Sequence, residues 1–331
     1  MLAQLPLTLA CGDYDRTRAL KDGRVGVEGC ALTYLAMEPE EVFHRAFKHQ
    51  EFDVSELSFS SYLRTVDSGD APYVAIPAFV SRLFRHSAIY IRTDRGIDAP
   101  ADLKGRLIGL PEYQITAVVW LRGIMQDEYG VKPTDIRWRQ GGVEEYGRKE
   151  RTPLKPIPGL ELESVPPGKT LSAMLESGEL DALYSARAPS CFLRGAPNVA
   201  RLFPDFREVE KAYYRKTKIF PPMHLIGIKR DLVERHPWLP ASLFKAFLQA
   251  KTIALREVNE IDALRVTLPW LVAEAQQTAA LMGEDFWRYG VRENANEIET
   301  LTRYAYEQGL TSRKLQAEDL FPASVIESSK I

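Results

Sequence analysis

The amino-acid sequence predicts a two-lobed α/β protein whose ligand site lies in a cleft between the lobes. Short apolar runs alternate with amphipathic helical stretches from residue 5 to about residue 90, and the alternation restarts near residue 99. The last third of the 331 residues is mostly helical. Two successive α/β units, followed by a return toward the first sheet and a helical tail, indicate that the chain crosses between the lobes twice. We place residues 1–90 and 212–331 in the first lobe, and residues 91–211 in the second.

The first lobe is predicted to contain four strands separated by helices, an order typical of a parallel sheet. One helical stretch carries Val42, Phe43, Ala46 and Phe47 on one face, as expected of a helix that packs on a sheet. The expected strands cover residues 5–10, 30–37, 52–58 and 73–80, and the expected helices cover 16–22, 38–50 and 60–69.

The second lobe repeats this pattern with less regularity. Residues 141–168 are rich in proline, glycine and charge, which predicts an irregular excursion with one strand at 160–165. The other expected strands cover residues 86–94, 106–110, 135–140 and 181–186, and the main helices end at Gly130 and near Leu180.

The opening stretch "LPLTLACGDYDRT", residues 5–17, fits two incompatible descriptions: an export signal, or a buried strand that ends in a ligand-binding loop. Residues 1–10 contain no Lys or Arg, and Pro6 interrupts an apolar core that is already too short for a signal. Leu5, Leu7 and Leu9 alternate with other residues, as in a strand. We therefore expect a strand, and a cytoplasmic protein.

Composition excludes several classes of protein. A formal net charge of −2 gives no electrostatic reason to expect nucleic acid or a membrane surface as partner, and no apolar run approaches the roughly 20 residues that span a bilayer. Three cysteines without a Cys-x-x-Cys pair argue against disulfides and a zinc ribbon. No dinucleotide, P-loop, zincin or hydrolase motif is present, so dinucleotide and P-loop chemistry are unsupported.

Arginine, histidine, serine and tyrosine gather on loops that should follow the strands. Such side chains favour a small anionic ligand, because guanidinium groups bind carboxylates in a planar, bidentate way. Each feature also has a structural explanation: residues 81–87 as a solvated strand start, residues 220–224 as a rigid turn, and Arg16 as a surface ion pair. The loop residues include Tyr14, Arg16, Glu56, Ser58, Arg82, His86, Glu112, Thr116, Arg187 and His224.

Several long segments resemble the 4,5-dihydroxyphthalate decarboxylase family. They are "ACGDYDRTRALKDGRVGVEG", "FDVSELSFSSYL", "IPAFVSRLFRHSAIYI", "DLKGRLIGLPEYQITAVVWLRGIMQDEYGV" and "RWRQGGVEEYGRKE", and the similarity runs from about residue 5 to about residue 260. The resemblance implies a type II periplasmic-binding-protein-like fold put to enzymatic use. It also implies non-oxidative loss of one carboxylate from 4,5-dihydroxyphthalate to give protocatechuate. The resemblance implies no required organic cofactor, so we expect no cofactor, with a divalent metal as an open alternative.

The implied chemistry gives the candidate residues hypothetical roles. Arg82 and Arg16 would hold the carboxylate that stays, and His224 would deliver a proton to the ring. His86 or Glu112 would polarise a catechol hydroxyl. The remaining substrate-binding candidates are Tyr14, Ser58, Thr116 and Arg187.

Two rival functions use the same fold. One is a solute-binding protein that captures a small aromatic carboxylate for an ABC transporter, which the absence of a signal peptide disfavours. The other is a decarboxylase of a related hydroxybenzoate. The expected partner is a small aromatic dicarboxylate, and we also expect a homo-oligomer.

Overall fold

The computed structural model describes residues 4–148 and 154–327, which form two compact units. Unit 1 comprises residues 1–82, 222–300 and 315–331, and unit 2 comprises residues 83–221 and 301–314. Compared with the lobes expected from the sequence, unit 2 begins earlier, ends later, and includes a late segment that returns to it. The helix Ala295–Glu307 (α11) carries the chain from unit 1 into that segment.

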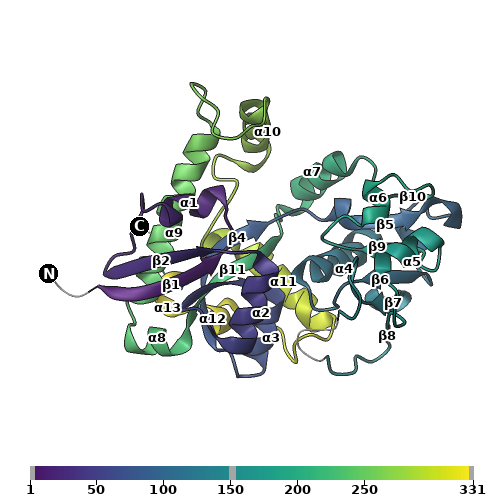
Figure 1. The fold of residues 1–331 in the computed structure, drawn as a ribbon, viewed down its shortest axis with the longest axis horizontal. Helices are drawn as coiled ribbons and strands as arrows, with labels where there is room; N and C mark the ends of the chain where they lie inside the picture. The colour runs from purple at the N-terminus through teal and green to yellow at the C-terminus, as the bar shows by residue number, and fades with distance from the viewer. Residues whose placement is uncertain (1–3, 149–153, 328–331) are drawn as a thin grey trace. The chain divides into compact units, whose positions relative to one another are not determined.

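Unit 1 is built on a mixed five-stranded sheet (Figure 1). The order is β2-β1-β3-β11-β4, with β1 parallel to β2 and β3 and with β11 antiparallel to β3 and β4. The all-parallel prediction was therefore wrong, because a strand from after unit 2 inserts between β3 and β4. The strands are β1 (Leu5–Cys11), β2 (Cys30–Ala36), β3 (Val54–Ser58), β4 (Tyr73–Arg82) and β11 (Pro222–Lys229).

The opening stretch is confirmed as a strand. The side chains of Leu7, Leu9 and Cys11 in β1 are buried, and all seven residues of β1 pair with β2. The helices of unit 1 are α1 (Asp15–Lys21), α2 (Pro39–His49), α3 (Phe59–Asp67), α8 (Arg230–Arg235), α9 (Leu239–Val258), α10 (Leu271–Met282), α12 (Ala317–Leu320) and α13 (Ala323–Ile326).

Unit 2 contains a six-stranded sheet in the order β10-β5-β9-β6-β7-β8. The strands are β5 (Ile89–Arg92), β6 (Leu107–Leu110), β7 (Arg137–Gln140), β8 (Glu161–Ser164), β9 (Ala182–Tyr184) and β10 (Val199–Arg201). Strand β5 runs antiparallel to β9 and β10, and the other pairs are parallel. The main helices are α4 (Thr116–Tyr129), α5 (Leu171–Ser177), α6 (Ser190–Leu193) and α7 (Phe206–Thr217).

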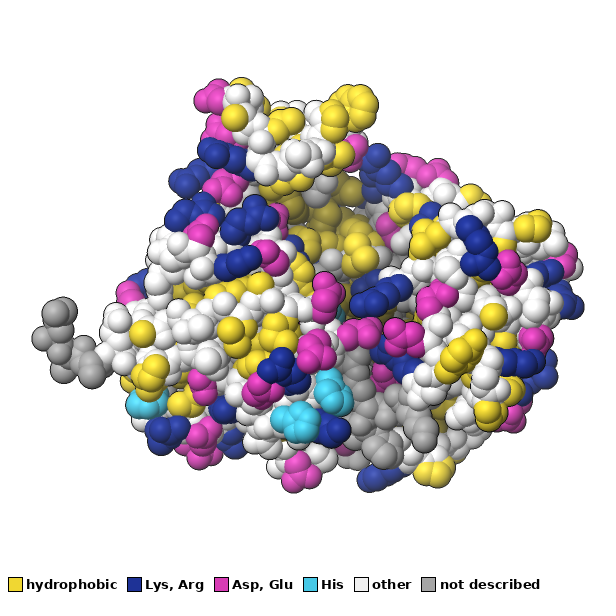
Figure 2. Space-filling model, in the orientation of Figure 1, with side chains coloured by type: hydrophobic (Ala, Val, Ile, Leu, Met, Phe, Trp, Pro, Cys, Tyr) yellow, Lys and Arg dark blue, Asp and Glu magenta, His cyan; other side chains and the backbone are white. Residues whose placement is uncertain are grey.

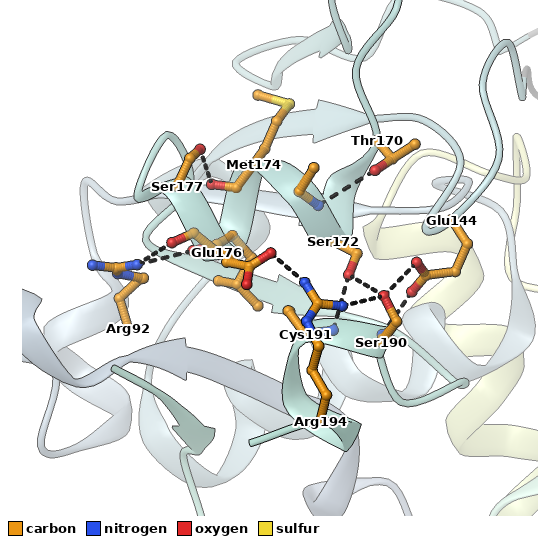
Figure 3. A network of polar contacts seen from close by, with 12 residues as sticks. Arg92, Glu144, Thr170, Ser172, Met174, Glu176, Ser177, Ser190, Cys191 and Arg194 are labelled. Carbon is orange, nitrogen blue, oxygen red and sulfur yellow. Dashed lines mark hydrogen bonds and ion pairs between the residues drawn. The ribbon is translucent and has the colours of Figure 1, made fainter. Parts of the chain in front are cut away.

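A polar network joins α5 and α6 in unit 2 (Figure 3). Ser190 Oγ lies 3.1 Å from Ser172 Oγ and donates to Glu144 at 2.7 Å, while Arg194 bonds both Ser190 and Glu176. The network contains serine and acidic side chains, and Cys191 joins it only through its backbone N–H, which donates to Ser172 Oγ at 3.3 Å. Because these contacts join α5, α6 and the loop that carries Glu144, we assign the network a structural role.

The return of the chain to unit 2 is marked by a close contact between helices. A Cβ atom on Gly123 of α4 would lie 2.2 Å from the Tyr304 ring of α11. Only glycine allows that approach, which explains a glycine in the interior of a buried helix. Among the described helices, none is both long and apolar enough to cross a membrane.

Candidate active site

The centre of the candidate site is the Glu56 carboxylate of β3, which is fully buried in unit 1. Its Oε2 accepts the Gly12 N–H at 2.8 Å and lies 3.4 Å from Cys11 Sγ. Its Oε1 accepts the Tyr14 hydroxyl at 2.8 Å and lies 2.6 Å from His224 Nδ1. One buried charge thus joins its own strand to two other stretches of sequence, residues 11–14 and His224.

The sheet explains why these residues meet. Strand β1 ends at Cys11 beside β3, so the loop that carries Gly12 and Tyr14 begins next to Glu56. In β11, His224 lies directly opposite Ser58 of β3. The sequence left open a rigid turn with a structural histidine or a site loop at residues 220–224, whereas His224 lies inside a strand. The backbone ladder, rather than the two prolines, therefore fixes its position.

Hydrogen bonds keep Glu56 ionised. Burial by itself would raise the pKa of this carboxyl, but bonds from His224, Gly12 and Tyr14 outweigh burial and hold the pKa below its usual value. A carboxylate only accepts hydrogen bonds, so the proton between the two groups belongs to His224 Nδ1. That arrangement leaves Nε2 as the other ring nitrogen of His224, the one not engaged by Glu56.

The surroundings fix the histidine and keep the nearby thiol neutral. The Phe43 ring packs edge-on against His224 with the ring centroids 4.7 Å apart, and the His224 side chain is 20% exposed. Burial, followed by the Glu56 charge, raises the pKa of the Cys11 thiol. Tyr34 supports the loop by donating from its hydroxyl to the Gly12 carbonyl at 2.6 Å.

Arg16 is held in the same unit with its guanidinium between two aromatic rings. The guanidinium carbon lies 4.2 Å from the Tyr14 ring centroid and 4.3 Å from that of Trp287. Nε donates to the Val80 carbonyl at 2.5 Å, and Nη1 lies 3.1 Å from Asp15 Oδ1. The sequence left open a surface ion pair or a ligand contact. The ion pair with Asp15 is present, and the rings orient the rest of the group.

Arg82 has a different setting in unit 1. It is buried, and Nη2 donates to the Arg288 carbonyl at 2.8 Å and to the Asn294 side chain. Nη1 lies 3.9 Å from Glu297 Oε1, and burial lowers the pKa of Arg82 to about 10. These contacts tie the end of β4 to residues 288–297. The role of Arg82 toward a substrate carboxylate stays a prediction.

Four of the residues singled out from the sequence lie in unit 2. His86 is buried within a 3-10 turn, and burial lowers its pKa to about 4. Both Nε and Nη2 of Arg148 donate to Glu112 Oε1, at 3.0 and 2.8 Å. Thr116 is the buried first residue of α4, and Arg187 is exposed. Their assignment to a substrate also stays a prediction.

The structure adds two residues that carried no assigned role. Glu56 stood among the loop residues, but only its burial and its donors mark it as the central charge. Trp287 lies in the helical last third, where no sequence pattern points to a site. Within residues 4–148 and 154–327, no three His, Cys, Asp or Glu side chains are grouped as metal ligands.

Comparison with known proteins supplies the family. No protein-family model matches the chain. It is 45% identical over 330 residues to the 4,5-dihydroxyphthalate decarboxylase of Comamonas testosteroni, covering 100% of both chains. It is also 47% identical over 215 residues to the enzyme of that name from Pseudomonas putida, covering 65% of this chain and 83% of that one.

Solved structures agree on the fold. A protein from Archaeoglobus fulgidus matches with a TM-score of 0.52 and 15% identity, over 92% of this chain and 98% of that one. A periplasmic sulfonate-binding protein from Methylobacillus flagellatus matches with a TM-score of 0.50 and 13% identity, over 96% and 92%. The predicted periplasmic-binding-protein-like fold is confirmed. Because the identity to the curated relative extends over its full length, the chain belongs to the 4,5-dihydroxyphthalate decarboxylase family.

Proposed function

We propose that the protein catalyses the non-oxidative decarboxylation of 4,5-dihydroxyphthalate to protocatechuate and CO2. The observation that carries the proposal is the Glu56–His224 pair, in which a buried carboxylate 2.6 Å from Nδ1 orients an imidazole whose Nε2 can donate a proton. Membership of the family indicates the substrate. The Glu56–His224 pair provides the proton donor that the reaction requires.

The substrate itself dictates what the site must do. Each carboxylate of 4,5-dihydroxyphthalate stands para to a phenolic hydroxyl. Loss of the phenolic proton pushes electron density onto the ring carbon that bears the carboxylate. A proton then adds to that carbon, the bond to the carboxylate breaks with its electron pair returning to the ring, and CO2 leaves. Overall, one carboxylate is replaced by one hydrogen.

His224 is proposed to deliver this proton from Nε2, and Glu56 to stabilise the imidazolium that precedes the transfer. General acid catalysis of this kind supplies roughly 10²–10⁴-fold in rate. Arg16 is proposed to bind the carboxylate that stays. The departing carboxylate needs a less cationic environment, because tight pairing would stabilise the ground state. Tyr14 and Ser58 would orient the ring.

The base that receives the catechol proton is proposed to be Glu112 or His86. Burial lowers the pKa of His86 to about 4, which makes its imidazole a weaker base than an ordinary histidine. That lowering counts against His86 and leaves Glu112 as the other candidate. We further propose that the enzyme needs no cofactor, acts in the cytoplasm and forms a homo-oligomer.

The direct test is to incubate chelator-treated protein with 4,5-dihydroxyphthalate and to measure protocatechuate and CO2. We expect turnover, and His224→Asn should lower kcat at least about 10²-fold with a small change in KM. His49→Asn, a change at an exposed histidine of α2, is the matched control and should keep wild-type kcat.

Three other results would change the assignment. Binding of the compound without product would favour the solute-binding alternative. Activity that returns only with a divalent cation would overturn the cofactor-free proposal. Turnover of a related hydroxybenzoate, with none of 4,5-dihydroxyphthalate, would retain the reaction class and change the substrate.

A further inference from the structure

The Tyr14 side chain contacts two parts of the site in unit 1. Its hydroxyl donates to Glu56 Oε1 at 2.8 Å, and the same oxygen lies 2.6 Å from His224 Nδ1. The Arg16 guanidinium carbon lies over the Tyr14 ring, 4.2 Å from the ring centroid. One tyrosine therefore contacts both the proposed acid pair and the arginine proposed to bind the retained carboxylate.

The Tyr14 side chain folds back over Gly12, two residues earlier in the loop. A Cβ atom on Gly12 would lie 2.4 Å from Tyr14 Cζ and 2.6 Å from its hydroxyl oxygen, well inside the separation at which carbon atoms pack. Gly12 does not have a positive φ, so its backbone conformation is not one that favours glycine. Glycine is needed at this position because the tyrosine ring occupies the space of a side chain.

The backbone of Gly12 is held on both sides by hydrogen bonds. Its N–H donates to Glu56 Oε2 at 2.8 Å. Its carbonyl accepts the Tyr34 hydroxyl at 2.6 Å and the Tyr14 N–H at 3.1 Å. Tyr34 belongs to β2, and its hydroxyl oxygen also lies 2.9 Å from Thr17 Oγ1 of α1. Because a shift of this backbone would break several bonds, the Tyr14 ring is the part that moves if residue 12 gains a side chain.

We propose that Tyr14 is a positioning residue that couples the Glu56–His224 pair to Arg16, and that Gly12 provides the space for this coupling. The Tyr14 hydroxyl holds Glu56 for the proton transfer, and the ring orients the guanidinium toward the carboxylate that the substrate keeps. The inference rests on the proposed function for the roles of the acid pair and of Arg16. The steric dependence of Tyr14 on Gly12 does not rest on it.

The first test separates the hydroxyl of Tyr14 from its ring. Tyr14→Phe removes only the bond to Glu56, so kcat for 4,5-dihydroxyphthalate should fall about tenfold with KM within about twofold. Tyr14→Leu also removes the ring over Arg16, so KM should in addition rise about 3- to 10-fold. Phthalate has both carboxylates but no hydroxyl and cannot react by this route, and its Kd should rise only in Tyr14→Leu. Equal rises in KM for both variants, or an unchanged kcat in both, would contradict the coupling.

The second test displaces Tyr14 without replacing it. Gly12→Ala adds one methyl group, and we expect it to reproduce the kcat loss and the KM rise of Tyr14→Leu and to lower the melting temperature by a few degrees. In a Tyr14→Ala background the same change should have no further effect on kcat, KM or melting temperature, because the ring that it displaces is gone. Losses that add in the double variant would show that the methyl group acts elsewhere, and the proposal would be wrong.

Gly26→Ala is the matched control. Gly26 is exposed and lacks a positive φ, and a Cβ atom there would meet no atom of the described residues within 4 Å apart from its chain neighbours. The change should leave kcat, KM, the phthalate Kd and the melting temperature as in the wild type. Melting temperatures and phthalate binding are measured without turnover, so the coupling is tested even if the proposed reaction fails. In that case, a phthalate Kd unchanged in Tyr14→Leu and Gly12→Ala would overturn the proposal.

Discussion

Both oxygens of the Glu56 carboxylate are engaged by hydrogen-bond donors of unit 1. Two donors approach each oxygen: Gly12 and Cys11 on one side, and Tyr14 and His224 on the other. A buried carboxylate is costly unless it is satisfied in this way. Because His224 contributes one of the four donors, the tautomer of the proposed acid depends on the charge of a residue that is itself fully buried.

Glu56→Gln is therefore expected to lower kcat by about 10²-fold or more, because the amide no longer fixes the proton on His224 Nδ1 or stabilises the imidazolium. Steady-state kinetics measures the effect, with circular dichroism as a check that the variant folds. The pH profile should also change, since the charge opposite the imidazole is lost.

The matched control is Glu51→Gln, a nearby carboxylate that is exposed and paired with Arg45. Exposed pairs contribute little, so its kinetics should equal those of the wild type. Wild-type kcat in Glu56→Gln would show that the buried charge serves the fold alone.

At the level of single residues, the sequence singled out Tyr14, Arg16 and His224. Tyr14 and Arg16 follow the recognisable strand 5–10, and His224 stands on a loop that was expected at the site. It gave no role to Glu56, because a carboxylate in the strand "VSELS" looks the same whether it faces solvent or the core. The role of Trp287 could not be predicted from the sequence, because its contact with Arg16 joins residues 271 positions apart and no local pattern encodes it.

At the level of elements, the 3-10 turn His86–Ala88 packs on α7 in unit 2 and brings two titratable groups into a buried setting. Burial raises the pKa of Glu210 to about 7 and lowers that of His86 to about 4. The Ser87 N–H donates to Glu210 Oε1 at 3.3 Å, and His86 Nδ1 lies 4.0 Å from the same oxygen. Both groups are therefore favoured in their neutral forms.

The Glu210 shift makes stability depend on pH. A carboxyl whose pKa is raised on folding costs stability as pH rises above its unfolded value of about 4.5, and the cost is complete above pH 7. Glu210→Gln should therefore stabilise the protein by about 1–2 kcal/mol at pH 8 and by little at pH 5. Thermal melts at the two pH values measure the difference.

Glu208→Gln provides the control on the same helix, because Glu208 is exposed and its pKa is lowered by Lys211. It should show no gain at pH 8. An equal gain for Glu210→Gln at both pH values would mean that packing, and not ionisation, is responsible.

Most elements were predictable, because strands 5–10, 30–37 and 52–58 and their helices follow simple periodicities. Strand β11 was not, since "FPPMHLIGIK" reads as a turn followed by an apolar run, and nothing local shows which strands it will join. Its antiparallel place between β3 and β4 is set by the fold as a whole. That place brings His224 into the site.

At the scale of the whole molecule, residues 261–270 expose an unusual number of large apolar side chains. Figure 2 shows hydrophobic side chains on the part of unit 1 that Figure 1 labels α10. Exposed apolar groups that are clustered mark interaction surfaces more often than scattered ones do. The cluster consists of Ile261, Leu264, Val266, Leu268 and Trp270, with Ile261 75% and Trp270 72% exposed.

If this cluster carries the proposed self-association, Trp270→Glu should lower the mass measured by light scattering, because a charge would replace a large exposed aromatic side chain. Leu193→Glu, at a similarly exposed position of unit 2, should leave the mass unchanged. A wild-type protein that already has the mass of one chain would contradict the proposal.

The division into two units has a consequence for the newly made chain. Strands β3 and β4 leave a gap that only β11 fills, and β11 comes after all of residues 83–221. The strands of the unit 2 sheet all lie between residues 89 and 201. During synthesis, that sheet therefore has all its strands before the first sheet does. The amino-terminal strands, including β3 with Glu56, therefore cannot complete their sheet until β11 has been translated.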